Sequence, residues 1–194
     1  HRRHGCRIAV MAGVAAMLPD WDGLTLVFGG GAYDMTHRIW GHNVLVAGTL
    51  GGLCGVAECA GNVTSRVQHW LRRVAPSLVS PVTDPPRGAP QRTIGTLTIW
   101  FFVGAVASLS HLAVDLVYAS HPRMQDWPLQ LLWPLSQRSF AYPIIHWGDV
   151  GATIVFVVEM FALYRWPRLA RTIASLTLGA VVFYVCARLA MNDL

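Results

Sequence analysis

One stretch of this sequence, from about Thr93 to Tyr118, is apolar over more residues than a membrane-spanning helix needs. It contains a single charged side chain, Asp115, and a helix of about 20 apolar residues already crosses the hydrocarbon core of a bilayer. The whole chain shares this character, since 54% of its 194 residues are hydrophobic and 13% are charged. Soluble domains carry about 25% charged residues. The sequence therefore predicts an all-α fold, a polytopic membrane helical bundle.

Further apolar runs bring the expected number of helices to about five, in a single domain over residues 1–194. They cover residues 8–18, 37–60, 149–166 and 172–191. The first run is too short to span, so we expect a buried helix or one that enters the membrane partway, ended by Pro19. A linker over residues 24–36, with three consecutive glycines, predicts a flexible turn.

Three other patterns bear on helix packing and on the membrane surface. Gly-x-x-x-Gly spacings in the 37–60 run predict close helix packing, at Gly48, Gly51, Gly52 and Gly55. Residues 63–74 have the pattern of an amphipathic surface helix. Residues 119–148 are rich in Trp and Pro, which is typical of a loop at the membrane–water boundary.

The arginines predict the orientation in the membrane. If successive runs cross it, residues 1–7, 61–92 and 165–171 share one side. That side has Arg2, Arg3, Arg7, Arg66, Arg72, Arg73, Arg87, Arg92, Arg165, Arg168 and Arg171, and the other has Arg38, Arg123, Arg138 and Arg188. By the positive-inside rule the arginine-rich side is cytoplasmic.

Six ionisable residues then meet near the extracytoplasmic side, and they predict a metal site. His111 and Asp115 are four residues apart and share one helix face, while Asp20 and Asp22 flank Trp21 in what we expect to be an extended turn. We expect His37 before the next helix and His42 in its first turn. Imidazoles and carboxylates together suit zinc, and also Mn or Fe(II), as one or two ions. The predicted ligands are Asp20, Asp22, His37, His42, His111 and Asp115, with Asp22 a ligand or the catalytic base that orients water.

Each pattern taken alone has a structural alternative. Pro-Asp-x-Asp-Gly also occurs as a helix-ending turn, and His111 with Asp115 also fits a buried polar pair that fixes helix packing. Asp149 fits a helix cap, and Glu159 lies in the middle of an apolar run, where it is either a hydrogen-bonding group or a deeper site member.

Several classes of protein are disfavoured. The arginines form no aromatic-interleaved patch, so no nucleic-acid partner is expected. The chain has no lysine and hence no phosphate-binding P-loop, and it has no Gly-x-Ser-x-Gly elbow of a serine hydrolase. The cysteines Cys6, Cys54, Cys59 and Cys186 show no C-x-x-C pairing and are interpreted as small buried residues.

In their order along the chain, these motifs resemble a known family, the LexA-binding, inner-membrane-associated metal-dependent hydrolases (YdjM-like). The resemblance covers roughly residues 8–140. It rests on Leu18-Pro19-Asp20-Trp21-Asp22, on His37-Arg38-Ile39-Trp40-Gly41-His42-Asn43, on Ser110-His111 through Asp115, and on Leu132-Trp133-Pro134. It implies a bacterial inner-membrane protein with a hydrolytic metal site.

The sequence departs from this family at two points. Gly41 and Asn43 replace the Thr and Ser that the family has beside its second histidine. The family also tends to begin with a Thr-His-containing helix, and we expect that helix, with one further ligand, to precede the sequence given. The motif order is also distantly similar to the zinc-dependent phospholipases C, which hints at phosphoester chemistry on lipid.

The resulting hypothesis is an integral membrane metal-dependent hydrolase that acts on a phosphoester or lipid-linked substrate at the extracytoplasmic face. Its partners would be membrane lipid and a small-molecule or lipid substrate. The alternatives are a transporter whose intramembrane His and Asp carry protons or metal ions, and a non-catalytic membrane scaffold.

Overall fold

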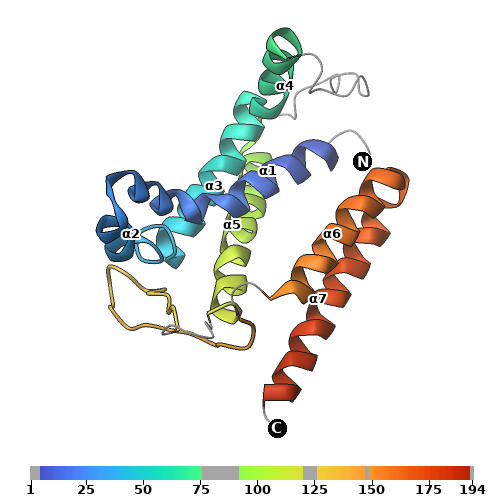
Figure 1. The fold of residues 1–194 in the computed structure, drawn as a ribbon. Helices are drawn as coiled ribbons and strands as arrows, with labels where there is room; N and C mark the ends of the chain where they lie inside the picture. The colour runs from blue at the N-terminus through green and yellow to red at the C-terminus, as the bar shows by residue number, and fades with distance from the viewer. Residues whose placement is uncertain (1–4, 76–91, 120–125, 147–148, 193–194) are drawn as a thin grey trace. The chain divides into compact units, whose positions relative to one another are not determined.

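The computed structural model describes residues 5–75, 92–119, 126–146 and 149–192, and none of these residues forms a strand (Figure 1). The all-α prediction is confirmed. The elements are α1 (Gly5–Met17), the 3₁₀ helix η1 (Leu18–Phe28), α2 (Gly30–Thr36), α3 (Val44–Gly61), α4 (Val63–Val74), α5 (Ile94–Val117), α6 (Val150–Arg165), the short 3₁₀ helix η3 (Pro167–Leu169) and α7 (Ala170–Asn192).

The chain forms two compact units, which are described separately. The first comprises residues 1–114 and 129–140, and the second comprises residues 115–128 and 141–194. Helix α5 therefore begins in the first unit, and its last residues, from Asp115, belong to the second. The expected single domain over residues 1–194 stays a prediction.

Within the described residues, four segments are long and apolar enough to cross a membrane. They are Arg7–Phe28, Val44–Gly61, Ile94–Val117 and Pro167–Met191. The predicted runs that became α3, α5 and α7 are among them, whereas α6 has only 16 residues. The amphipathic stretch 63–74 is helix α4, as predicted.

The first α-helix ends close to Pro19, as expected, but the helical segment as a whole does not end there. The α-helix does end at Met17, but η1 continues to Phe28, with Pro19 in its first turn. Proline fits this position because first-turn N–H groups need no intrahelical acceptor. Together, α1 and η1 reach the length of a span that the 8–18 run lacked.

The expected flexible linker over residues 24–36 is also wrong. Of the three glycines, only Gly29 leaves helical geometry, with φ of 106°, a value that favours glycine. Gly30 begins α2, which runs to Thr36. A single turn residue therefore joins η1 to α2, and the two form a helical hairpin.

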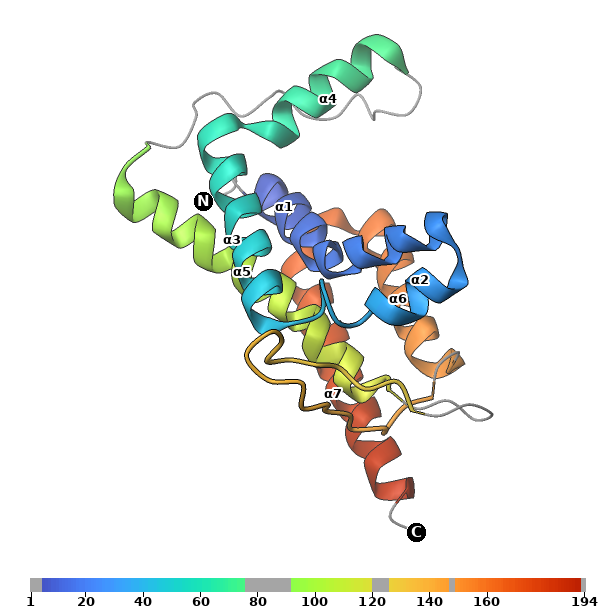
Figure 2. The ribbon, with the colours of Figure 1, turned by 90° about the vertical axis from the view of Figure 1, so that its left-hand side faces the viewer.

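In the first unit, α3 and α5 approach closely through glycines, as the Gly-x-x-x-Gly spacing predicted (Figure 2). A Cβ atom built on Gly51 would lie 2.5 Å from the Gly104 carbonyl oxygen, and one built on Gly55 would overlap the Trp100 carbonyl oxygen. Here α1 contributes Met11 and Ala15 to a buried cluster with Cys59 and Trp100.

The second unit contains the α6–α7 hairpin. Asp149 caps α6, as one alternative predicted, by accepting from the Gly151 N–H at 2.8 Å. The same carboxylate accepts from the Tyr184 hydroxyl and pairs with Arg188 at 3.0 Å, which ties the start of α6 to α7. Glu159 lies on the wall of a mainly apolar groove of about 320 Å³ between the two helices.

Three cysteines, Cys54, Cys59 and Cys186, are free thiols, in agreement with the sequence pattern. The side chain of Cys6 lies outside the described residues. Only Cys59 of the three is fully buried, and Cys186 is exposed, so the expectation of uniformly buried thiols holds in part.

Candidate metal centre

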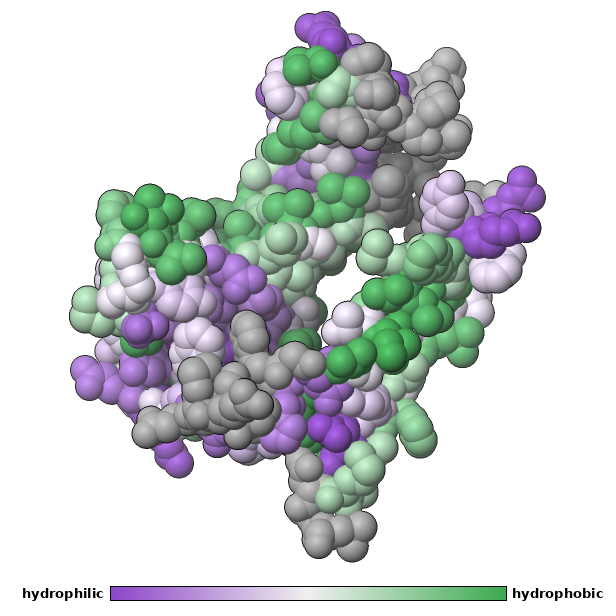
Figure 3. Space-filling model, in the orientation of Figure 1, coloured by the Kyte–Doolittle hydropathy of each residue, from purple (hydrophilic) through white to green (hydrophobic). Residues whose placement is uncertain are grey.

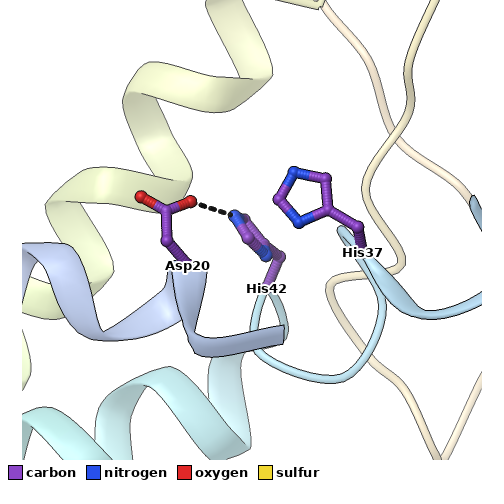
Figure 4. Close-up of side chains that lie close together, drawn as sticks. All are labelled: Asp20, His37 and His42. Atoms are coloured by element: carbon purple, nitrogen blue, oxygen red, sulfur yellow. Dashed lines mark ion pairs between the residues drawn. The ribbon is translucent and has the colours of Figure 1, made fainter. Parts of the chain in front are cut away.

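Four segments of the first unit carry five of the six predicted ligands. Asp20 and Asp22 lie on η1, His37 ends α2, His42 precedes α3, and His111 projects from α5. Figure 4 shows Asp20 and His37 on either side of the His42 ring. One ligand atom from each of these three residues lies within 4.8 Å of the others. Residues far apart in the sequence therefore lie close together. The sequence led us to expect this, because it assigned them all to the same side of the membrane.

Asp22 is fully buried and holds two histidine rings. Its Oδ1 lies 2.8 Å from His37 Nδ1, its Oδ2 lies 3.1 Å from His42 Nδ1, and Oδ2 also accepts from the Gly41 N–H at 2.8 Å. A carboxylate only accepts hydrogen bonds, so each Nδ1 carries the hydrogen, and in the neutral ring Nε2 is then the nitrogen with the lone pair that a metal needs.

Asp20, in contrast, is half exposed and faces the other side of the His42 ring. Its Oδ1 lies 3.3 Å from His42 Nε2 and 3.5 Å from His111 Nε2. Ligand atoms around a tetrahedral zinc ion with bonds of about 2.1 Å are roughly 3.4 Å apart. The two distances from Asp20 Oδ1 to the histidine Nε2 atoms thus match the spacing of donor atoms around one zinc ion.

The expected extended turn at Asp20 and Asp22 is wrong, and the difference changes their roles. In an extended chain, residues i and i+2 face one side, but in a 3₁₀ helix they point about 120° apart. Because both lie on η1, Asp22 turns inward and Asp20 outward, with His42 between them. The two carboxylates therefore do not face a shared pair of ions.

His42 also lies outside the first turn where we expected it. Helix α3 begins at Val44, and Asn43 caps it by accepting from the Val46 N–H at 2.9 Å. The Asn43 amide also donates to the Ile39 and Trp40 carbonyl oxygens at 3.0 and 2.9 Å, which fixes the turn that presents His42. An asparagine directly before an apolar run was a readable capping signal.

The η1–α2 hairpin holds His37 in place. The His37 ring stacks on the Tyr33 ring, with the two ring centroids 4.4 Å apart. The Thr25 hydroxyl donates to the Asp22 carbonyl oxygen at 2.6 Å and lies 2.7 Å from the Thr36 hydroxyl. Burial raises the pKa of Tyr33, against the opposing effect of Arg38. Tyr33 and these threonines carry no sequence motif, so sequence analysis missed them.

Arg38 and Gly41, which are adjacent in sequence to the two histidines, lie where the backbone restricts the choice of residue. Arg38 is buried and adopts a φ of 65°, in the left-handed region that non-glycine residues rarely occupy. A Cβ atom on Gly41 would overlap the Pro19 carbonyl oxygen, so no residue with a Cβ atom fits this backbone. Glycine at this position lets the 37–43 segment lie directly on η1.

Asp115 lies one turn after His111 on α5, as predicted, and one ligand atom of each lies within 4.8 Å of the other. An i, i+4 pair of this kind can present both groups to one ion. Glu159, the possible deeper member, lies in the α6–α7 groove of the second unit instead.

Comparison with known proteins agrees with this architecture. The chain matches the family described as YdjM inner membrane protein over residues 2–193, which is nearly its whole length. The chain belongs to this YdjM family. Searches of curated proteins and of solved structures found no match.

Membership of the YdjM family confirms the inner-membrane location and the resemblance seen in the motifs. The match also extends beyond residues 8–140, through the α6–α7 hairpin. The LexA link, the likeness to zinc phospholipases C, the metal and the hydrolytic activity stay predictions.

Proposed function

We propose that this YdjM-family protein is a metal-dependent hydrolase that holds one divalent ion, preferably zinc, at Asp20, His42 and His111. The observation that carries the proposal is the convergence of two imidazole Nε2 atoms on one carboxylate oxygen, at 3.3 and 3.5 Å. His37 lies beside them, with one ligand atom within 4.8 Å of one from Asp20 and one from His42. When bound, such an ion polarises an ester oxygen and lowers the pKa of water.

Asp22 serves in this proposal as the residue that orients His37 and His42, rather than as a ligand or base. Both of its oxygens already accept hydrogen bonds, and it is fully buried. Carboxylates that bind the far nitrogen of a ligating histidine fix its tautomer and ring position. The half-exposed Asp20 is the carboxylate that a substrate can approach.

The proposed substrate is a phosphoester, lipid-linked or otherwise amphiphilic. Large apolar side chains are exposed along η1, within a few residues of Asp20 and Asp22, at Leu24, Leu26, Val27 and Phe28. Figure 3 shows this end of the first unit as a hydrophobic patch beside a hydrophilic surface. An apolar surface next to polar ligands suits a substrate with an apolar tail.

The arginine distribution supports a site that faces the extracytoplasmic side. Residues 61–92, which are rich in arginine, connect the end of α3 to the start of α5. His42 precedes the start of α3, and His111 lies near the end of α5, so both lie toward the other ends of these helices. A carrier would instead need ionisable groups through the membrane midplane. The candidate ligands Asp20, His37, His42 and His111 gather in one part of the first unit, which favours the hydrolase over the transporter.

Metal content, measured by mass spectrometry on full-length protein purified in detergent, tests the proposal. We expect roughly one zinc, manganese or iron ion per chain, retained in His69→Ala and lost in His42→Ala and in His111→Ala/Asp115→Ala. His69 lies on α4 and serves as the matched histidine control. A metal-loaded protein then justifies a screen of phosphoester lipids. Folded wild-type protein without metal would favour the scaffold or transporter.

A further inference from the structure

Helix α4 has two chemically distinct faces. At 100° per residue, its apolar side chains Val63, Val67, Trp70 and Val74 fall within about 60° of one another. All four are exposed, by 44% to 62%. The rest of the helix carries Arg66, Arg72 and Arg73 and no acidic residue. Such a helix is typical of one that lies flat in a membrane interface.

The start of α4 is fixed to the ends of two apolar spans. Glu58, near the end of α3, accepts from Arg7 Nε and from the Thr64 N–H, each at 2.7 Å. Arg7 begins the first span and is buried together with Glu58, and its guanidinium lies 5.5 Å from the Trp100 ring. Asn62, with φ of 50°, makes the turn between α3 and α4.

The contacts of Glu58 with Arg7 and Thr64 lie at the opposite end of the spans from the candidate metal centre. Helix α3 begins two residues after His42 and ends at Gly61, directly before the α4 turn. The first span likewise begins at Arg7 and reaches Asp20 and Asp22 only past the end of α1. Since α4 starts where a span ends, it begins at the membrane surface away from the site.

We infer that α4 is an interfacial helix that binds the anionic lipid headgroups of this leaflet. Its apolar face would enter the acyl boundary, and its arginines would contact lipid phosphates. Two observations favour lipid over a second copy of the chain or a partner protein. The helix continues directly from a membrane span, and pairing with a second α4 would bring six arginines together without a compensating acid.

Hydrogen–deuterium exchange of the full chain in nanodiscs tests this inference, at one chain per disc. The discs contain either phosphatidylcholine alone or phosphatidylcholine with phosphatidylglycerol. An arginine near an anionic surface is worth roughly a factor of five in binding. We therefore expect backbone exchange over residues 63–74 to slow at least about fivefold in the anionic discs. In Arg66→Gln/Arg72→Gln/Arg73→Gln, the two lipids should give equal rates.

The contrary results are equally specific. Equal protection of the wild type in both lipids would overturn the anionic-lipid assignment. Protection that arises only in discs with two chains would show that a second copy covers α4. Quenching by brominated lipid, as the difference between wild type and Trp70→Phe, gives a second measurement, and its absence would also overturn the inference. Because no candidate ligand lies on α4, these outcomes are independent of the metal content.

Discussion

Asp22 is the residue through which two candidate histidine ligands are held, although it need not touch the ion itself. An amide in its place would turn an NH₂ group toward one Nδ1–H and lose that hydrogen bond. We expect Asp22→Asn to weaken zinc binding about 10- to 100-fold, as measured by competition with a chromogenic chelator. Asp34→Asn, an exposed change on α2 of the same hairpin, is the control. Equal affinities in the two variants would contradict the orienting role.

Gly41 gives a second prediction at the residue scale. A methyl group there would overlap the Pro19 carbonyl oxygen, so Gly41→Ala must push η1 away from the histidine segment. We expect it to lower the free energy of unfolding by about 1–3 kcal/mol. Gly31→Ala on α2 meets no atom within 4 Å and should be neutral or slightly stabilising, because alanine favours a helix. Thermal unfolding in one detergent compares the two, and equal melting temperatures would refute the close contact.

At the scale of elements, the packing of α3 against α5 should require glycine where the two backbones touch and tolerate other residues elsewhere. The Gly55→Ala methyl group would meet the Trp100 carbonyl oxygen, which is backbone and has little room to move. We expect a loss of about 1–3 kcal/mol. Gly95→Ala on α5, with open space around it, should change stability far less. If both variants unfold alike, helix contact is not limited by these small residues.

The α6–α7 hairpin offers a prediction on pH. The hydrogen bond from the Tyr184 hydroxyl lowers the pKa of Asp149, assisted by the Gly151 N–H and by Arg188. A lowered folded-state pKa stabilises the fold fully above about pH 4, the value of an unfolded aspartate, and this contribution is lost as the pH falls toward the folded value. The difference in melting temperature between wild type and Asp149→Asn should therefore shrink on acidification below about pH 4. A constant difference would show that Asp149 does not titrate in this way.

At the scale of the whole molecule, the sequence predicted what depends on hydrophobic length and missed what depends on local backbone geometry. The apolar runs predicted α3, α5, α6 and α7 to within a few residues, apart from the polar start of the 37–60 run. Helices η1 and α2 were missed because Pro19 and three glycines were interpreted as helix breakers, although proline suits a first turn. The sequence grouped Asp20, His42 and His111 through the side of the membrane expected for each, and the structure places the three close together. The opposite orientations of Asp20 and Asp22 depend on the 3₁₀ geometry, which no spacing rule indicates.

The candidate ion would join η1, the 37–43 turn and the part of α5 that carries His111, which all belong to the first unit. A ligand that binds only the folded state stabilises it by about 2.7 kcal/mol at a hundredfold excess over its dissociation constant. We expect added zinc to slow hydrogen exchange in these three segments and to leave α7 unchanged, because no predicted ligand lies on α7. Chelator should reverse the effect, and His42→Ala should abolish it, while His69→Ala keeps it. Zinc-dependent protection that extends equally over α7, or that survives in His42→Ala, would place the ion elsewhere in the chain.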